Sequence, residues 1–221
     1  WKKMISAPSI NSMTDNLVER LTETFRRFPG TGPRQARRFV YHLLREGRGT
    51  IDRLATDLRL LHTAVVQCER CFRFYSSDSK KVGSSHCDLC DTKTRDNTLL
   101  MIVEKDADLE AVRQSGTYGG QFFVLGGLIP ILEKEPQSKA RLRELTKTIA
   151  DRLAAEKLIE VIVALAVNPE GDHTIEILKH TLKDFTDKGL RLSVLGRGLS
   201  TGTELEYSDA ETLKNALANR S

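Results

Sequence analysis

Four cysteines within a stretch of 23 residues constrain this chain more than any other feature of its sequence. They form two CxxC pairs, Cys68-Glu-Arg-Cys71 and Cys87-Asp-Leu-Cys90, with fifteen residues between the pairs. Each pair predicts a tight turn that offers two sulfurs to one ion, and the intervening loop lets the two turns face each other. Four thiolates complete a tetrahedral zinc sphere and leave no position for a substrate. We therefore expect one structural Zn²⁺ per chain.

Two disulfides, or four free thiols, are the alternatives to zinc. Residues 1–13 lack the apolar core of a secretory signal, and their Ser, Pro and Asn content predicts a loose tail. No apolar run approaches the roughly 18 residues that are needed to span a membrane. The pattern therefore favours a cytoplasmic protein with reduced thiols, and hence zinc over disulfides. His86 adjoins a ligand cysteine, and we expect it to lie outside the coordination sphere.

Positive charge is concentrated ahead of the cysteines. Eight arginines lie between Arg20 and Arg48, against Glu23 and Glu46, which gives this segment a net charge of +6. The whole chain carries +4, so the remainder carries +4 minus +6, or −2. Such an asymmetry favours a polyanion-binding end of the chain, although a solvated, arginine-rich helical face is the simpler alternative.

The same segment predicts two helices joined by a glycine turn. Apolar spacing predicts a helix over Thr14–Phe28, capped by Thr14 or Asp15, and Pro33 suits the first turn of a second helix. Glycines between them let the backbone approach a phosphate, and free N–H groups at the second helix start offer it hydrogen bonds. Such contacts would bind the DNA backbone and ignore the bases; an ordinary αα-hairpin is the alternative. The predicted DNA-binding residues are Gly30, Gly32, Arg34, Arg37 and Arg38, of which Arg34 and Arg38 share a helix face.

Strands and helices alternate after the cysteines, following a third predicted helix over Ile51–Val66 that directs Leu54, Leu58 and Leu61 inward. Apolar strands separated by helices predict a mainly parallel sheet that is covered on both faces. The predicted strands are Leu99–Val103, Gln121–Leu125, Glu160–Val167 and Arg191–Leu195. The predicted helices are Gln137–Lys157, Thr174–Asp187 and Ala210–Ala218.

Acidic residues follow two of these strands. Glu104, Asp106 and Asp108 follow the first strand, and Glu170-Gly-Asp172 follows the third. The carboxyl ends of neighbouring parallel strands border the ligand crevice of an open sheet. Carboxylate oxygens suit Mg²⁺, but ordinary loop residues explain the acids equally well. The candidate acidic set, for Mg²⁺ or for a partner contact, is Glu104, Asp108, Glu170 and Asp172.

The order of these motifs is distinctive. A basic helix-hairpin-helix precedes a four-cysteine knuckle and a Toprim-like α/β domain that carries Ile102-Val-Glu104 and Glu170-Gly-Asp172. The chain then contains Arg197-Gly-Leu-Ser-Thr-Gly-Thr-Glu-Leu-Glu-Tyr207 and Thr212-Leu-Lys-Asn-Ala-Leu. From about Leu17 onward, these strings resemble the RecR family of bacterial recombination mediators. Departures from the family pattern lie at Phe122-Phe123, Ser193-Val194 and Ser200.

The resemblance implies a non-enzymatic protein of recombinational repair, cytoplasmic and associated with the nucleoid. Members of the family assemble into dimers and ring-like tetramers that encircle DNA, and with RecO they help to load RecA onto single strands coated by SSB. The implied partners are DNA, single- or double-stranded and without sequence preference, then RecO and RecF, and indirectly RecA and SSB. By resemblance, Arg34 and Arg38 occupy the basic hairpin positions, and the region near Glu170 contacts RecO.

These predictions together give an α+β multidomain chain without membrane contact. A flexible tail (residues 1–13) precedes a helix-hairpin-helix domain (14–66), a four-cysteine zinc finger (67–92) and a Toprim-like α/β domain with a mainly parallel sheet (93–195). A C-terminal helical segment (196–221) then packs on that domain or on a neighbouring subunit. The leading hypothesis is a DNA-binding mediator that forms a clamp-like homodimer or homotetramer. The alternatives are a Mg²⁺-dependent Toprim enzyme of nuclease or primase type, and a zinc protein that docks partners without touching DNA.

Overall fold

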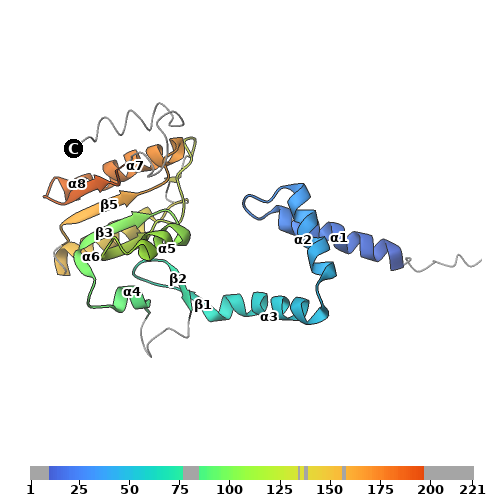
Figure 1. The fold of residues 1–221 in the computed structure, drawn as a ribbon. Coiled ribbons are helices and arrows are strands. Elements are labelled where there is room, and N and C mark those ends of the chain that lie inside the picture. Colours follow the sequence, from blue (N-terminus) through green and yellow to red (C-terminus); the bar gives the residue numbers. More distant parts are fainter. Residues whose placement is uncertain (1–9, 77–84, 134, 137–138, 156–157, 197–221) are drawn as a thin grey trace, which may run out of the picture. The chain divides into compact units, whose positions relative to one another are not determined.

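The computed structural model describes residues 10–76, 85–133, 135–136, 139–155 and 158–196 (Figure 1). The chain divides into two compact units, Trp1–Thr63 and Ala64–Ser221, and each is described by itself. The predicted C-terminal segment, including the helix Ala210–Ala218, lies outside the described residues. In the described part, no helix is both long enough and apolar enough to cross a lipid bilayer.

The first unit is built from three helices, and its first two form the predicted hairpin. They are α1 (Ile10–Arg26), α2 (Pro33–Arg45) and α3 (Arg48–Ala64). The helix α1 begins four residues before Thr14, so Thr14 and Asp15 lie inside it and not at its N-terminal end. The Ile-Asn-Ser-Met residues ahead of Thr14 contain neither glycine nor proline, which are the residues that stop a helix. The helix therefore enters the segment that was predicted as a tail.

Aromatic rings and a glycine turn hold α1 and α2 together. The Phe25 ring packs edge-on against Phe28 at 5.6 Å and against Phe39 of α2 at 5.8 Å between ring centroids. The N–H of Thr31 donates to the carbonyl of Phe28 at 3.1 Å, and Gly30 has φ +72°. Only glycine adopts that backbone conformation without steric cost, which explains Gly30 at this turn. Pro33 opens α2, as predicted.

The third helix differs from its prediction. Leu54, Leu58 and Leu61 were expected to point inward, but they are 41%, 59% and 54% exposed. The helix α3 has no buried residue. Apolar spacing predicts which face of a helix is suited to burial. It does not show whether another helix or strand packs on that face. Within the described residues of the first unit, no other helix covers this face of α3.

The second unit is organised on a four-stranded sheet that is wholly parallel, in the order β4-β3-β5-β6. Its strands are β3 (Asp96–Val103), β4 (Gly120–Val124), β5 (Glu160–Ala164) and β6 (Arg191–Val194). All four predicted strands are confirmed, with β3 starting earlier and β5 ending earlier than expected. β3 pairs with β4 on one side and with β5 on the other. The order in which the chain adds strands to the sheet therefore changes direction at β3.

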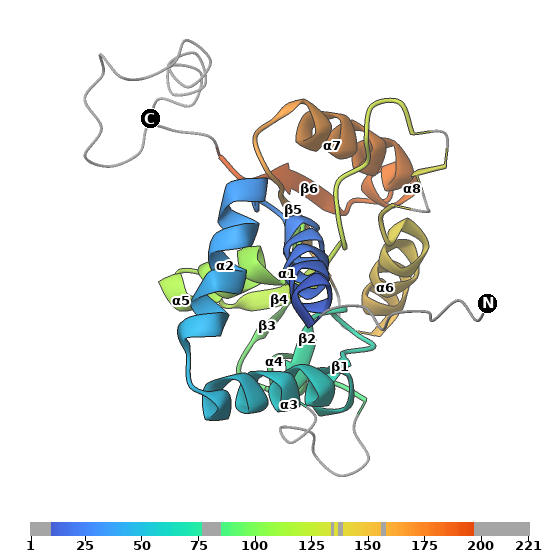
Figure 2. The same cartoon turned by 90° about the vertical axis from the view of Figure 1, so that its right-hand side faces the viewer.

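Helices cover both faces of this sheet, as predicted (Figure 2). They are α5 (Asp106–Ser115), α6 (Leu142–Ala155), α7 (Pro169–Thr181) and α8 (Lys183–Thr186). Leu100 and Ile102 of β3 pack with residues of α6 and α7, whereas Met101 and Val103 pack on the other face with Leu109 of α5. This alternation follows from the two-residue period of a strand. It buries one continuous apolar cluster on each face.

The helix α5 was not predicted, two predicted helices of the second unit begin at other residues, and one of these two is broken into two helices. Lys105 N donates to the Asp108 carboxylate at 3.1 Å at the start of α5, and Gly116 closes that helix in the left-handed region. Asn168 caps α7 and Pro169 occupies its first position, so α7 begins five residues before Thr174. The predicted helix Thr174–Asp187 breaks at Leu182 into α7 and α8. The helix α6 begins at Leu142 because Arg141 N still bonds to the carbonyl of Leu125.

Candidate metal centre and nucleic-acid interface

The four cysteines lie together at the start of the second unit. They belong to a knuckle made of the antiparallel strands β1 (Val65–Gln67) and β2 (Phe74–Ser76) and the short helix α4 (Asp88–Asp91). All four thiols are buried and free of disulfides. Their sulfurs all lie within 4.8 Å of one another. The Cys68–Cys90 and Cys71–Cys87 sulfurs are 3.8 Å and 3.6 Å apart, which is too long for a disulfide bond of about 2.05 Å.

These separations fit a tetrahedral metal site. Zinc–sulfur bonds of about 2.3 Å place the corners of a tetrahedron about 3.8 Å apart, which is close to the observed sulfur separations. In the described part of the chain, these cysteines are the only group of three or more His, Cys, Asp or Glu side chains that is close enough to hold an ion. His86 lies outside this group, as expected, and its Nδ1 is 3.6 Å from the carboxylate of Asp91.

The crowded sulfurs shift one another's pKa values in opposite directions. Hydrogen bonding with Cys71 is the largest cause that lowers the pKa of Cys68, and the same contact raises the pKa of Cys71. The Cys68 sulfur raises the pKa of Cys90. It also raises that of Cys87, but Cys71 and Cys90 outweigh it and lower the Cys87 pKa to about 6. A bound cation would stabilise all four sulfurs as thiolates and release their remaining protons.

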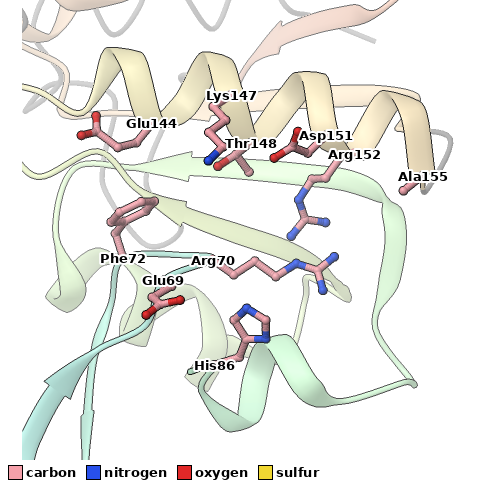
Figure 3. Close-up of a pocket in the computed structure, with 10 residues that line it drawn as sticks. All are labelled: Glu69, Arg70, Phe72, His86, Glu144, Lys147, Thr148, Asp151, Arg152 and Ala155. Atoms are coloured by element: carbon pink, nitrogen blue, oxygen red, sulfur yellow. The ribbon is translucent and has the colours of Figure 1, made fainter. Parts of the chain in front are cut away.

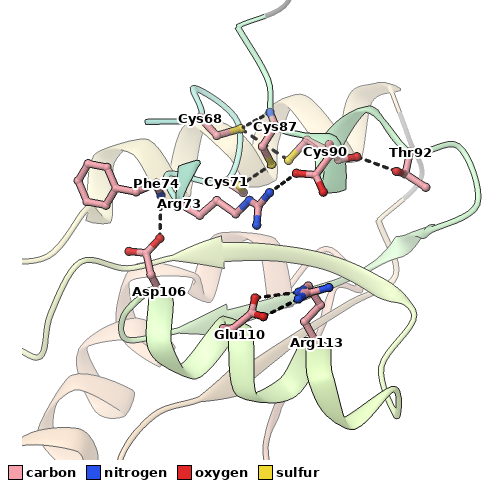
Figure 4. A network of polar contacts seen from close by, with 11 residues as sticks. Cys68, Cys71, Arg73, Phe74, Cys87, Cys90, Thr92, Asp106, Glu110 and Arg113 are labelled. Atoms are coloured by element: carbon pink, nitrogen blue, oxygen red, sulfur yellow. Dashed lines mark hydrogen bonds and ion pairs between the residues drawn. The ribbon is translucent and has the colours of Figure 1, made fainter. Parts of the chain in front are cut away.

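The knuckle is fastened to the sheet by polar contacts that the sequence did not predict (Figure 4). Val124 N at the end of β4 donates to the carbonyl of Cys71 at 2.8 Å. Phe74 N donates to the carboxylate of Asp106 in the first turn of α5 at 2.7 Å. Within the knuckle, Arg73, which is mostly buried, pairs with Asp88 beside Cys87. The contacts to Val124 and Asp106 depend on how the knuckle packs on the sheet and α5, which no local sequence pattern records.

The predicted DNA-binding residues lie at one end of the hairpin unit. Gly30 and Gly32 form the turn, and nothing within 4 Å would meet a Cβ at either position. Arg34, Arg37 and Arg38 occupy the first two turns of α2, and all three side chains are exposed. Within the described residues, no carboxylate forms an ion pair with any of them. The arrangement presents uncompensated positive charge beside an open backbone turn, which suits a phosphate.

The structure divides the predicted acidic residues between different roles. Asp106 accepts a hydrogen bond from Phe74 N in the knuckle, and Asp108 accepts one from Lys105 N at the start of α5. Glu104 follows β3 and lies 3.7 Å from the ammonium of Lys105. Glu170 and Asp172 lie in the first turn of α7, beyond the neighbouring strand β5. Both strands end at the same edge of the sheet, but the acids form no described group of three metal ligands, so Mg²⁺ binding stays a prediction.

The glycine between the last two acids has no space for a side chain. A Cβ on Gly171 would lie 1.9 Å from the carbonyl oxygen of Ala166. We expect Gly171→Ala to force this loop apart and to cost about 1–3 kcal/mol of folding free energy, which lowers Tm by several degrees. Thermal unfolding by circular dichroism measures it. Gly119→Ala is the control, because nothing lies within 4 Å of that position. Equal melting temperatures for both variants would contradict this packing.

A cavity of about 440 Å³ lies between the knuckle and α6 (Figure 3). Arg70, His86 and Arg152 direct their nitrogen atoms toward one another at one end of it. At the other end, Glu69 and Glu144 lie beside the Phe72 ring. The candidate acidic set is not among its lining residues, so this cavity does not join those acids into a catalytic pocket.

Comparisons with known protein families divide the chain in the same order. Residues 18–61 match the family described as RecR, helix-hairpin-helix, and residues 98–195 match the Toprim domain. Residues 198–221 match the family described as RecR, C-terminal.

The matching relatives cover nearly the whole chain. The recombination protein RecR of Legionella pneumophila subsp. pneumophila is 36% identical over 208 residues, which are 94% of this chain and 98% of that protein. The RecR of a Mycobacterium species is 33% identical, with the same coverage of both chains. The RecR of Herpetosiphon aurantiacus is 33% identical over 210 residues, 95% of this chain and 96% of that protein.

Proposed function

The chain belongs to the RecR family of recombination proteins, and from this premise we propose that it is a DNA-binding mediator subunit of recombinational repair. The observation that carries the proposal is the exposed arginine group beside the glycine turn. Arg34, Arg37 and Arg38 bind phosphates, and the open turn at Gly30 and Gly32 admits the DNA backbone. Because these contacts involve no base edges, the protein binds single- and double-stranded DNA without sequence preference.

Zinc is the metal that we propose for the four cysteines. The sulfur separations and the all-thiolate donor set support it. When bound, zinc supplies structural cross-linking and no chemistry on a substrate, since four thiolates leave no open position. Asp106 and Val124 hydrogen-bond to the knuckle, so bound zinc would hold the knuckle folded against the sheet of the second unit.

The proposal also includes an oligomeric assembly and its partner proteins. We propose a clamp-like homodimer or homotetramer, supported by the exposed leucines of α3, which a neighbouring subunit would cover. The mediator works with RecO and RecF to load RecA onto strands coated by SSB, in the cytoplasm and at the nucleoid. Exposed Glu170 and half-buried Asp172 are the proposed acidic contact for RecO.

A non-catalytic role separates this proposal from the Toprim enzyme alternative. The one observation that favours an enzyme is that Glu104, Glu170 and Asp172 follow two neighbouring parallel strands at one edge of the sheet. The proposal instead assigns these acids to partner contact. The exposure of Glu170 and the partial exposure of Asp172 support that assignment.

We expect purified protein to leave supercoiled and single-stranded DNA intact with Mg²⁺ or Mn²⁺. A zinc ion held by four thiolates has no open position at which to activate water, and the proposal assigns the sheet-edge acids to partner contact. A plasmid-nicking assay over several hours, with Glu104→Gln in parallel, measures this. Metal-dependent cleavage that Glu104→Gln abolishes would establish the enzyme and refute the mediator proposal. Cleavage unaffected by that substitution would indicate a contaminating nuclease, and the non-catalytic assignment would then stand.

A further inference from the structure

One face of α2 carries more than the predicted arginines. Ala36 and Val40 are 0% and 1% exposed and point toward the interior of the hairpin unit. At about 100° per residue, the side of the helix directly opposite them carries a row of exposed residues, which we call the outer stripe of α2. Its members are Arg34, Arg38, Tyr41, His42 and Arg45.

A tyrosine ring lies among the cations of this stripe. Tyr41 is 50% exposed, and the residues three before it and four after it are Arg38 and Arg45. At a rise of 1.5 Å per residue, the two arginines lie about 4.5 Å and 6 Å from Tyr41 along the helix axis. A shallow groove of about 580 Å³ runs along this side of α2. It is lined by Gln35, Arg38, Phe39, Tyr41, His42 and Arg45.

Proteins bind single strands with cationic side chains that alternate with exposed aromatic rings. Arginines attract successive phosphates, while an aromatic ring stacks on a base, whichever base it is. In a duplex, base faces are already stacked on their neighbours, so the Tyr41 ring finds no free base face on which to stack. Neither Arg38 nor Arg45 is engaged by a carboxylate among the described ion pairs, so both are available to phosphates.

We propose that Tyr41 is a stacking platform that gives the outer stripe a preference for single-stranded DNA. The inference rests on the proposed function, because it presupposes that α2 binds the DNA backbone. It adds a residue and a substrate class to that function, since the glycine turn and the arginines by themselves do not distinguish one strand from two. Arg45 adds a further phosphate-binding arginine to the outer stripe, beyond Arg34 and Arg38.

The test compares one labelled oligonucleotide, single-stranded and as a blunt duplex of equal length, by fluorescence anisotropy over a series of salt concentrations. We expect Tyr41→Ala in the full-length, zinc-loaded protein to weaken single-strand binding about tenfold and to leave duplex affinity within about twofold. The slope of log affinity against log salt stays unchanged, because tyrosine neutralises no phosphate. Tyr41→Phe, which keeps the ring, retains wild-type affinity. Arg45→Ala weakens both forms and lowers the slope by about one.

Three results overturn the stacking proposal. The first two are equal losses for both DNA forms and no loss for either form, and each shows that Tyr41 does not stack on a base. The third is a change in the mass of Tyr41→Ala by light scattering, which places Tyr41 between two copies of the chain and not on DNA. A fourth result, wild-type protein that binds neither form, contradicts the proposed function itself and is distinct from the other three. Thermal unfolding of each variant checks that the helix remains folded.

Discussion

Replacing Cys87 with serine is expected to abolish metal binding and to unfold the knuckle. The zinc content falls from about one ion per chain to near zero, because three thiolates and a hydroxyl form a far weaker site than four thiolates. Structural zinc sites of this kind contribute on the order of 10 kcal/mol to folding. Losing even half of that would lower Tm by more than about 10 °C in a domain of this size. Elemental analysis and thermal unfolding measure the two effects.

The neighbouring residue provides the control for this prediction. His86→Ala alters a side chain beside the site but leaves all four sulfurs, and we expect that variant to retain its zinc. A thiol count on the denatured, metal-free wild type should give four per chain. Full zinc content in Cys87→Ser, or fewer than four thiols in the wild type, would be incompatible with the four-thiolate site.

The second large effect is expected from removing two arginines of the turn. The double variant Arg34→Ala with Arg38→Ala should lose about tenfold or more in affinity for DNA at moderate salt. Each arginine that binds a phosphate also releases condensed counterions, so the slope of log affinity against log salt should fall by about two. Both side chains are exposed, so folding stability should change little. Anisotropy titrations of single- and double-stranded DNA measure both quantities.

A charge-matched variant distinguishes the effect of where the arginines lie from the effect of net charge on DNA affinity. Arg53 and Arg59 are exposed arginines of α3, and replacing both by alanine removes the same total charge from the same unit. We expect that variant to bind DNA more tightly than the α2 double variant. Equal losses in the two variants would mean that diffuse charge, and not the glycine turn, attracts DNA.

Sequence reasoning was most successful where a physical constraint was local. Two CxxC pairs specify a metal site wherever the turns can meet, and the sulfurs do meet. Pro33 after a glycine turn fixed the start of α2. The parallel sheet followed from apolar runs separated by helices, because only a strand covered on both faces can be apolar throughout.

Contacts between segments that are distant along the chain could not be predicted from the sequence. Asp106 was grouped with the sheet-edge acids, but its carboxylate bonds to the knuckle, 32 residues away along the chain. The helix α5 was missed even though Asp108 and Gly116 mark its two ends. The leucines of α3 were assigned to a core that no described element of the first unit provides. Tyr41 was overlooked as well, although its spacing from Arg38 would have placed it on the same helix face.

The central claim is that the hairpin unit binds the nucleic-acid backbone irrespective of base sequence. Affinity of the zinc-loaded protein for several unrelated oligonucleotides, followed across a range of salt concentrations, addresses it directly. We expect each plot of log affinity against log salt to be a straight falling line, with one common slope for all sequences of the same strand type. Absence of binding even at 20–50 mM salt, or affinity that varies with sequence and not with salt, would contradict it.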